Sequence, residues 1–221
     1  MAAANRQTGI RMGNKHDGHL GAVYNARGTA EVAALYDKWS KTYDAEMAVA
    51  GYRHPSICLA LLARYLPRGA APLLDAGAGT GLIGEWLGII GYPVVEALDI
   101  SPGMLNVARA KGIYTTLHEL ALGGPLPFPD GHFAGVISAG VFTTGHVGAE
   151  GLDELLRICA PGGVVVLTIK TTIWDGGFAA RVDELTTGGT IVIAEQTAPY
   201  VSMPGEAGTV PSIGLVLRIL P

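Results

Sequence analysis

From about residue 70 onward, short apolar runs alternate with longer segments in which apolar residues recur every three or four positions. The first pattern is typical of buried strands and the second of amphipathic helices. The pattern predicts strands in the run that begins at Leu73, at 94–99, near 114–119, and at 134–139, 163–169, 190–194 and 213–219, with helices at 82–90, 102–111, 149–160 and around 175–187. This alternation indicates an α/β fold with a parallel sheet, helices on both faces, and a ligand site at the carboxyl ends of the strands.

The part of the chain before the first strand has a helical pattern. Between Ala30 and Met47 an aromatic stripe, with Tyr36, Trp39 and Tyr43 among its members, follows one helical face. A second helix is expected at 57–66, after Tyr52-Arg53-His54-Pro55 interrupts the first. Residues 1–29 show little periodicity, which predicts a mobile N-terminal arm. We therefore expect one domain over 30–221, divided into a helical lid region at 30–66 and a core at 72–221.

A glycine loop follows the first predicted strand. Glycines at 77, 79 and 81 remove the side chains where the chain turns into a helix, so a ligand can approach the backbone N–H groups of the helix start. Leu82 stands where a dinucleotide fingerprint requires its third glycine, and no Gly-Lys-Ser/Thr of a phosphate loop follows. Asp99 ends the next strand about twenty residues later, the spacing at which a carboxylate accepts hydrogen bonds from ribose hydroxyls.

Three motifs extend this pattern: Asp75-Ala-Gly-Ala-Gly-Thr-Gly81, Leu98-Asp-Ile-Ser-Pro-Gly-Met-Leu105 and Leu126-Pro-Phe-Pro-Asp-Gly-His-Phe133. In this order and spacing they resemble the class I S-adenosylmethionine-dependent methyltransferases. Further segments are similar to the Williams-Beuren-region methyltransferase-like group, namely Tyr36–Asp44, Tyr52–Pro55, Ala108-Arg109 and Gly145–Val147. The resemblance covers roughly Tyr36 to Thr171 and implies a Rossmann-like sheet of seven strands, mostly parallel, with the last strand antiparallel.

The same resemblance implies S-adenosylmethionine as cofactor and S-adenosylhomocysteine as product. The expected cofactor-binding residues are Asp75, Gly77, Ala78, Gly79, Gly81, Asp99, Ile100, Met104, Leu120, Ala121, Leu122, Tyr36, Trp39, Tyr43 and Arg53. For the aromatic stripe and for Arg53, a role other than cofactor binding is left open. The aromatic stripe can close the pocket around the sulfonium or pack on the sheet, and Arg53 can bind a carboxylate or remain a solvated charge.

The segment after the fourth strand faces the departing methyl group in the family that the chain resembles. His146 is the candidate catalytic residue, because a neutral imidazole can take a proton from an acceptor hydroxyl or amine. The alternative is a histidine that fixes the loop by hydrogen bonding. Val141, Phe142 and Trp174 are the candidate substrate-binding residues.

The predicted function is transfer of a methyl group, by in-line displacement, to O, N or S of a small-molecule acceptor. A non-catalytic protein that binds S-adenosylmethionine or S-adenosylhomocysteine needs the same loop and Asp99, so it is the alternative interpretation. Leu82 and the absence of a Tyr-x-x-x-Lys pair count against a nicotinamide oxidoreductase.

The composition of the chain indicates which kinds of binding partner to expect. A chain of 221 residues with 49% hydrophobic content suits one globular domain, and a formal net charge of −4 does not favour nucleic acid as a partner. The two cysteines, Cys58 and Cys159, lie far apart in apolar helical patterns, which is typical of buried thiols rather than of a disulfide or metal site. No apolar run has transmembrane length. We expect a cytoplasmic monomer or homodimer without a metal or a membrane partner.

Overall fold

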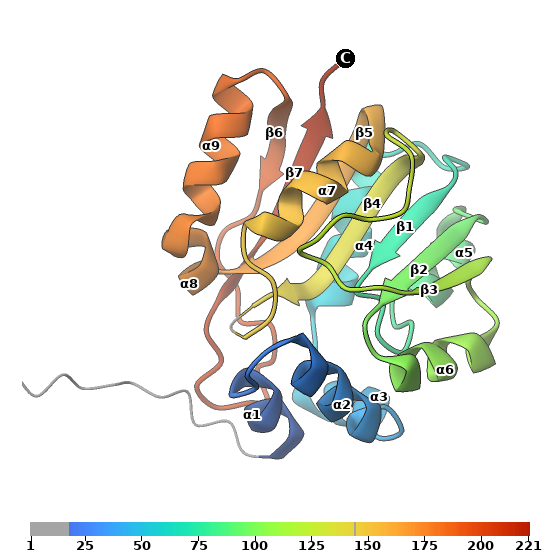
Figure 1. Ribbon diagram of the computed structural model, residues 1–221, viewed down its shortest axis with the longest axis vertical. Helices are drawn as coiled ribbons and strands as arrows, with labels where there is room; N and C mark the ends of the chain where they lie inside the picture. Colours follow the sequence, from blue (N-terminus) through green and yellow to red (C-terminus); the bar gives the residue numbers. More distant parts are fainter. Residues whose placement is uncertain (1–17, 144) are drawn as a thin grey trace, which may run out of the picture.

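The computed structural model describes residues 18–143 and 145–221, and its centre is one seven-stranded sheet (Figure 1). The strand order is β3-β2-β1-β4-β5-β7-β6. The strands are β1 (Leu73–Ala76), β2 (Val95–Asp99), β3 (Thr116–Glu119), β4 (Phe133–Phe142), β5 (Cys159–Lys170), β6 (Ile191–Gln196) and β7 (Ser212–Ile219). Strands β1 to β5 pair in parallel, and β7 lies antiparallel between β5 and β6. The predicted fold class is confirmed.

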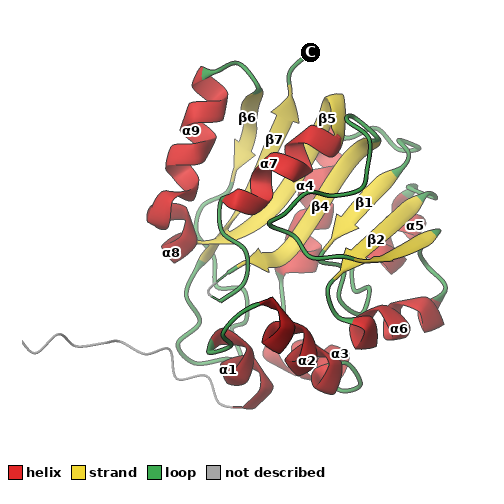
Figure 2. Cartoon of the chain, viewed as in Figure 1, coloured by secondary structure: helices red, strands yellow, loops and turns green. Residues whose placement is uncertain are grey.

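Helices cover both faces of the sheet and one of its ends (Figures 1 and 2). They are α1 (Gly18–Tyr24), α2 (Thr29–Trp39), α3 (Tyr43–Ala50), α4 (His54–Tyr65), α5 (Gly84–Ile90), α6 (Pro102–Lys111), α7 (Glu150–Ile158), α8 (Thr171–Ile173) and α9 (Ala179–Thr187), with a π-helical turn η1 (Trp174–Phe178) before α9. Helices α7 and α9 share one buried cluster with the sheet, whereas α4 and α5 share another. Helices α1, α2 and α3 lie across the end at which the arrows of β1 and β4 finish. None of the described helices is long and apolar enough to cross a membrane.

The helix expected over 30–47 is two helices in the structure. Side-chain hydroxyls compete for the carbonyls at the end of α2: Ser40 Oγ donates to the Asp37 carbonyl at 2.8 Å, and Thr42 Oγ1 donates to the Trp39 carbonyl at 3.4 Å. Helix α3 then begins at Tyr43. The next helix begins at His54 rather than at residue 57, because Pro55 is tolerated in a first helical turn, where its missing N–H needs no partner.

The N-terminal segment also differs from the expected mobile arm. Gly18–Tyr24 forms α1, and Val23 in it is fully buried beside Trp39 and Met203. An apolar side chain of this kind holds its helix on the body, since its burial removes apolar surface from water. The rest of the expected arm, residues 1–17, lies outside the described residues.

We predict that Leu155→Ala lowers the free energy of unfolding by about 2–5 kcal/mol, because it leaves a cavity in the core between α7 and the sheet. Leu155 is fully buried in that cluster. Ile89→Ala on α5 is the control, since Ile89 is 68% exposed and its loss should change stability by no more than about 0.5 kcal/mol. Urea unfolding of both variants checks this, and equal stabilities would contradict the assignment of the core.

Candidate active site

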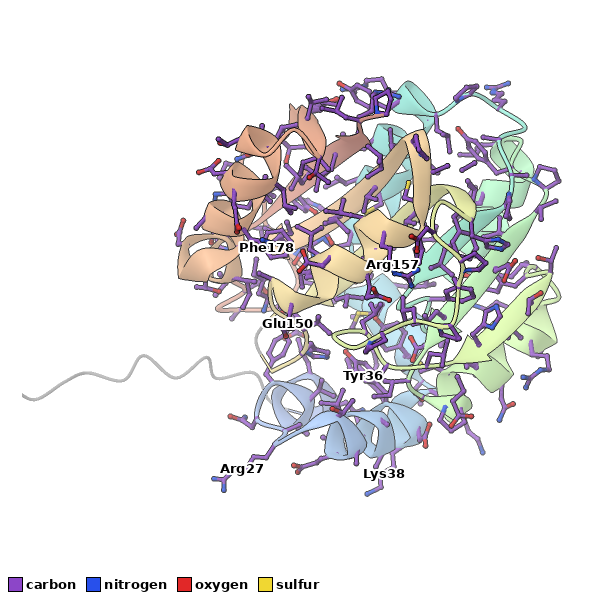
Figure 3. All side chains as sticks on the ribbon, turned by 45° about the horizontal axis from the view of Figure 1, so that its top comes forward. Arg27, Tyr36, Lys38, Glu150, Arg157 and Phe178 are labelled. Carbon is purple, nitrogen blue, oxygen red and sulfur yellow. The ribbon has the colours of Figure 1, made fainter. Side chains whose placement is uncertain are left out.

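A cavity of about 570 Å³ lies between the carboxyl ends of the strands and the helices that cross them. Its floor comes from the loops after β1, β2 and β3 and from the end of β4, and its roof from α2, α3 and their flanking loops. The lining residues are Ala26, Gly28, Thr29, Val32, Tyr36, Tyr43, Tyr52, Gly77, Gly79, Leu98, Asp99, Ile100, Met104, Leu120, Ala121, Leu122, Gly123, Ala139, Gly140, Val141, Gly145, His146, Val147 and Glu150. Figure 3 shows Tyr36 and Glu150 between the roof helices and the sheet.

Asp99 is held in a fixed orientation at the floor. Its Oδ2 accepts a hydrogen bond from the Gly79 amide at 2.8 Å, and its Oδ1 accepts one from the Ser101 amide at 2.9 Å. Burial raises the pKa of Asp99, although these backbone N–H groups act in the opposite direction by stabilising the carboxylate. A carboxylate oxygen accepts more than one hydrogen bond, so both oxygens keep acceptor capacity at the edge of the cavity.

Two glycines of the loop have different surroundings. Gly77 has φ +80°, and a Cβ there would lie 2.2 Å from Cγ2 of Val141, so only glycine lets this loop lie against β4. Gly79 has φ +56° and lines the cavity, and a Cβ there would meet no atom within 4 Å. Its bare backbone therefore borders open space in which a ligand can lie.

Two carboxylates attach the roof to the floor. Asp37 Oδ1 on α2 accepts hydrogen bonds from Ser101 Oγ at 2.5 Å and from the Gly103 amide at 2.7 Å, both at the start of α6. Asp44 on α3 accepts from the hydroxyl of Thr80 in the glycine loop and from Lys111 Nζ at 2.6 Å. The roof is thus connected to the same loops that hold Asp99.

Half-buried tyrosines line the roof. Burial raises the pKa of Tyr36, Tyr43 and Tyr52 above the usual value, and the charge of Asp99 adds to the effect at Tyr36 and Tyr43. These phenols therefore stay protonated at neutral pH and can donate hydrogen bonds. The Tyr36 hydroxyl lies 2.9 Å from Nε2 of His146, which joins the roof to the loop after β4.

Most of the site residues expected from the sequence lie together around this cavity. They are Gly77, Gly79, Asp99, Ile100, Met104, Leu120, Ala121, Leu122, Tyr36, Tyr43, Val141 and His146. Three others lie in or directly before the glycine loop but do not line the main cavity, namely Asp75 in β1 and Ala78 and Gly81 in the loop. Asp75 is buried beneath the loop, where it accepts a hydrogen bond from the Tyr114 hydroxyl at 2.6 Å, and burial raises its pKa to about 7. Asp75 therefore supports the loop from below.

Four expected site residues lie elsewhere. Trp39 is 1% exposed, donates from Nε1 to Glu46 Oε2 at 2.8 Å and packs in the cluster between α1 and α3. Arg53 is exposed and reaches the Val201 carbonyl at 3.5 Å. Phe142 and Trp174 both pack on Phe178, with ring centroids 5.2 and 6.2 Å away. Helical periodicity identified Trp39 as inward-facing, but inward here means toward the core.

The sequence analysis missed several lining residues, of which Thr29, Tyr52 and Glu150 carry polar side chains. Tyr52 had a signal, because it stands in the segment Tyr52–Pro55 that resembles the methyltransferase-like group. Glu150 had none, since an acidic residue in the first turn of a helix is explained by the helix dipole alone. The described residues contain no group of three potential metal ligands.

Comparisons with known proteins agree with this geometry. A family described as a methyltransferase domain matches residues 74–167. Methyltransferase-like protein 27 of Homo sapiens is 33% identical over 192 residues, which cover 76% of this chain and 78% of that protein. A demethylmenaquinone methyltransferase of Clavibacter sepedonicus is 34% identical over 141 residues, covering 62% of this chain and 57% of that protein.

A solved structure shares the fold. The TehB-like SAM-dependent methyltransferase from Corynebacterium glutamicum superimposes with a TM-score of 0.60 and 21% identity, over 84% of this chain and 98% of that one. The chain belongs to the class I S-adenosylmethionine-dependent methyltransferases, in the group that includes methyltransferase-like protein 27.

The residues present fit S-adenosylmethionine. The cavity volume of about 570 Å³ is within the usual range for small-molecule sites. Asp99 offers oriented acceptors for a pair of hydroxyls, and the Gly79 backbone faces open space. Ile100 and Met104 line the cavity beside Asp99 and provide apolar walls.

We predict that Asp99→Ala weakens the binding of S-adenosylhomocysteine at least about tenfold, because charge-assisted hydrogen bonds contribute roughly 1.5–3 kcal/mol. The matched control is Glu119→Ala. Glu119 ends the neighbouring strand, pairs in register with Asp99, is exposed and does not line the cavity. Calorimetry on both variants measures the difference, and an unchanged affinity in a folded Asp99→Ala protein would reject the ribose assignment.

Proposed function

We propose that this protein transfers the methyl group of S-adenosylmethionine to O, N or S of a small-molecule acceptor enclosed in the same cavity. The observation that carries the proposal is the roof. Helices α2 and α3 cross the carboxyl ends of the strands and are attached to the floor through Asp37 and Asp44. An acceptor must therefore fit beneath two anchored helices, which favours a small molecule over a folded chain.

The cofactor supplies a methyl group that its sulfonium charge already activates toward nucleophiles. What remains for the protein is to position both reactants and exclude water, and positioning alone can account for roughly 7–11 kcal/mol of the barrier. Asp99 and the Gly79 backbone are proposed to hold the cofactor. Tyr43 and Val141, from opposite sides of the cavity, are proposed to exclude water and to contact the acceptor.

His146 is the proposed proton acceptor. It lines the cavity, and a neutral imidazole carries on one ring nitrogen a lone pair that can accept a proton. The Tyr36 hydroxyl, 2.9 Å from Nε2, orients the ring from the roof. This arrangement supports acceptors that carry a hydroxyl, amine or thiol proton. The name of the Clavibacter relative, demethylmenaquinone methyltransferase, is consistent with a small-molecule acceptor.

A screen of small hydroxylated, amine and thiol compounds, read by release of S-adenosylhomocysteine, tests the proposal. We expect turnover with at least one compound class and binding of S-adenosylhomocysteine without any acceptor. Binding without turnover across the whole screen would favour the non-catalytic alternative. Failure to bind either form of the cofactor would reject both interpretations.

With an acceptor in hand, we predict that His146→Ala lowers kcat about a hundredfold or more, the usual contribution of a general base. The affinity for S-adenosylhomocysteine should stay within about twofold, because the proposed cofactor contacts lie elsewhere in the cavity. His132→Ala is the control, since His132 does not line the cavity. A His146→Ala enzyme with wild-type kcat would leave His146 only the role of fixing its loop.

We also predict that the roof responds to the cofactor. Hydrogen exchange in α2 and α3 should slow when S-adenosylhomocysteine is added, because the ligand fills the cavity beneath the two helices. Strands β2 and β5 should change little, since their apolar side chains are already buried in the core. Exchange rates in the two helices that are the same with and without ligand would show that the roof is not a lid.

A further inference from the structure

A charged side chain is buried just outside the wall of the cavity. Lys170 is the last residue of β5 and is only 3% exposed. Its ammonium has no hydrogen-bond partner among the described residues. The contact that it makes is with the ring of Tyr24, whose centroid is 3.9 Å from Nζ.

Two hydroxyls without partners lie at the same end of the sheet. Ser212 pairs directly with Lys170 in the β5–β7 ladder, and its backbone also bridges to Tyr200, two residues before Ser202. Both serines are fully buried, and in the described part of the chain neither Oγ has a hydrogen-bond partner. At this end of the sheet an ammonium and two hydroxyls, all able to donate, are therefore buried without an acceptor among the described residues.

This arrangement costs stability unless something else engages it. A buried ammonium without a carboxylate is less favourable than an apolar side chain of the same length, which would fill the space at no electrostatic cost. Burial lowers the pKa of Lys170 to about 8, so the group is still mostly protonated at neutral pH. The missing partner must carry acceptors and, to match the ammonium, a negative charge.

Lys170 lies near the part of the cavity wall that carries His146. Ile169, the residue before Lys170, pairs with Phe142 of β4, and the chain continues from there to Gly145 and His146 in the cavity wall. The ring of Tyr24 stands between the two groups: it covers Nζ on one side, and its centroid is 6.3 Å from that of His146 on the other. Tyr24 therefore contacts both Lys170 and His146 of the cavity wall.

We propose that Lys170, with the hydroxyls of Ser202 and Ser212, binds an oxyanion of the methyl acceptor, and that the Tyr24 ring covers this subsite until the acceptor displaces it. The acceptor class is then a small molecule with a carboxylate or phosphate group as well as the methylated atom. The inference rests on the proposed function, since it names the substrate class of that cavity.

The test uses the full chain saturated with S-adenosylhomocysteine and three probes of similar shape: benzoate, phenyl phosphate and neutral benzamide. Calorimetry should show that at least one anion binds the wild-type protein more tightly than benzamide does. In Lys170→Met that preference should fall at least about tenfold, because the charge-assisted hydrogen bonds are lost. The anion that binds more tightly tells whether the natural group is a carboxylate or a phosphate.

Lys38→Met is the matched control, because Lys38 is exposed and points away from the body of the molecule in Figure 3. It should keep the wild-type preference for the anion. The same preference in Lys170→Met as in the wild-type protein, or no preference in the wild-type protein, would overturn the subsite. The affinity for S-adenosylhomocysteine is measured separately in each protein, so a failure of the cofactor site is distinguishable from a failure of the subsite.

Thermal unfolding tests the premise that the Lys170 ammonium is buried without a partner. Replacing an unpaired buried ammonium by an apolar side chain should raise the melting temperature of Lys170→Met, whereas Lys38→Met should leave it nearly unchanged. A lower melting temperature in Lys170→Met would contradict the premise that the charge lacks a partner and would count against the subsite.

Discussion

The site depends on one chain of hydrogen bonds that starts at Asp99. Its carboxylate accepts from the amides of Gly79 and Ser101, and Ser101 Oγ in turn donates to Asp37 on α2. These contacts connect the loop after β1, the start of α6 and the roof. Since the parallel strands β1 and β2 are neighbours, their loops emerge side by side, and a single carboxylate can fix both. These hydrogen bonds therefore hold the loops at the floor of the cavity in place relative to each other and to the roof.

Ionisable groups buried around the cavity reduce the stability of the fold. Burial raises the pKa of Asp99 and of Asp75 and lowers that of Lys170, so in each case the fold opposes the charged form. The carboxylates are partly compensated by hydrogen bonds, whereas the described residues offer the ammonium an aromatic ring and no hydrogen-bond partner. Groups of this kind are a local exception to an otherwise consistent apolar core, and such exceptions are typical of functional sites.

The roof shows how one helical stripe can serve two purposes. Tyr36 and Tyr43 line the cavity, while Trp39, on the same stripe, is buried against Met47 and Met203. The break between α2 and α3 separates these positions, because Tyr43 begins the second helix. Core packing is thus observed at Trp39, and closure of the pocket around a cofactor stays a prediction for Tyr36 and Tyr43.

The sequence by itself determined the features that depend on local chemistry. The glycine loop, the carboxylate at Asp99 and the strand-helix alternation follow from backbone freedom and from periodicity, which neighbouring residues alone decide. Only the tertiary structure decided which inward-facing residues meet the cavity, as the different fates of Tyr36 and Trp39 show. It also brought Lys170 to Ser212, because β7 inserts between β5 and β6 through pairing of segments far apart in sequence. A spacing of apolar residues with a period of 3.6 or 2 distinguishes buried from exposed positions. It carries no information about what the buried face contacts.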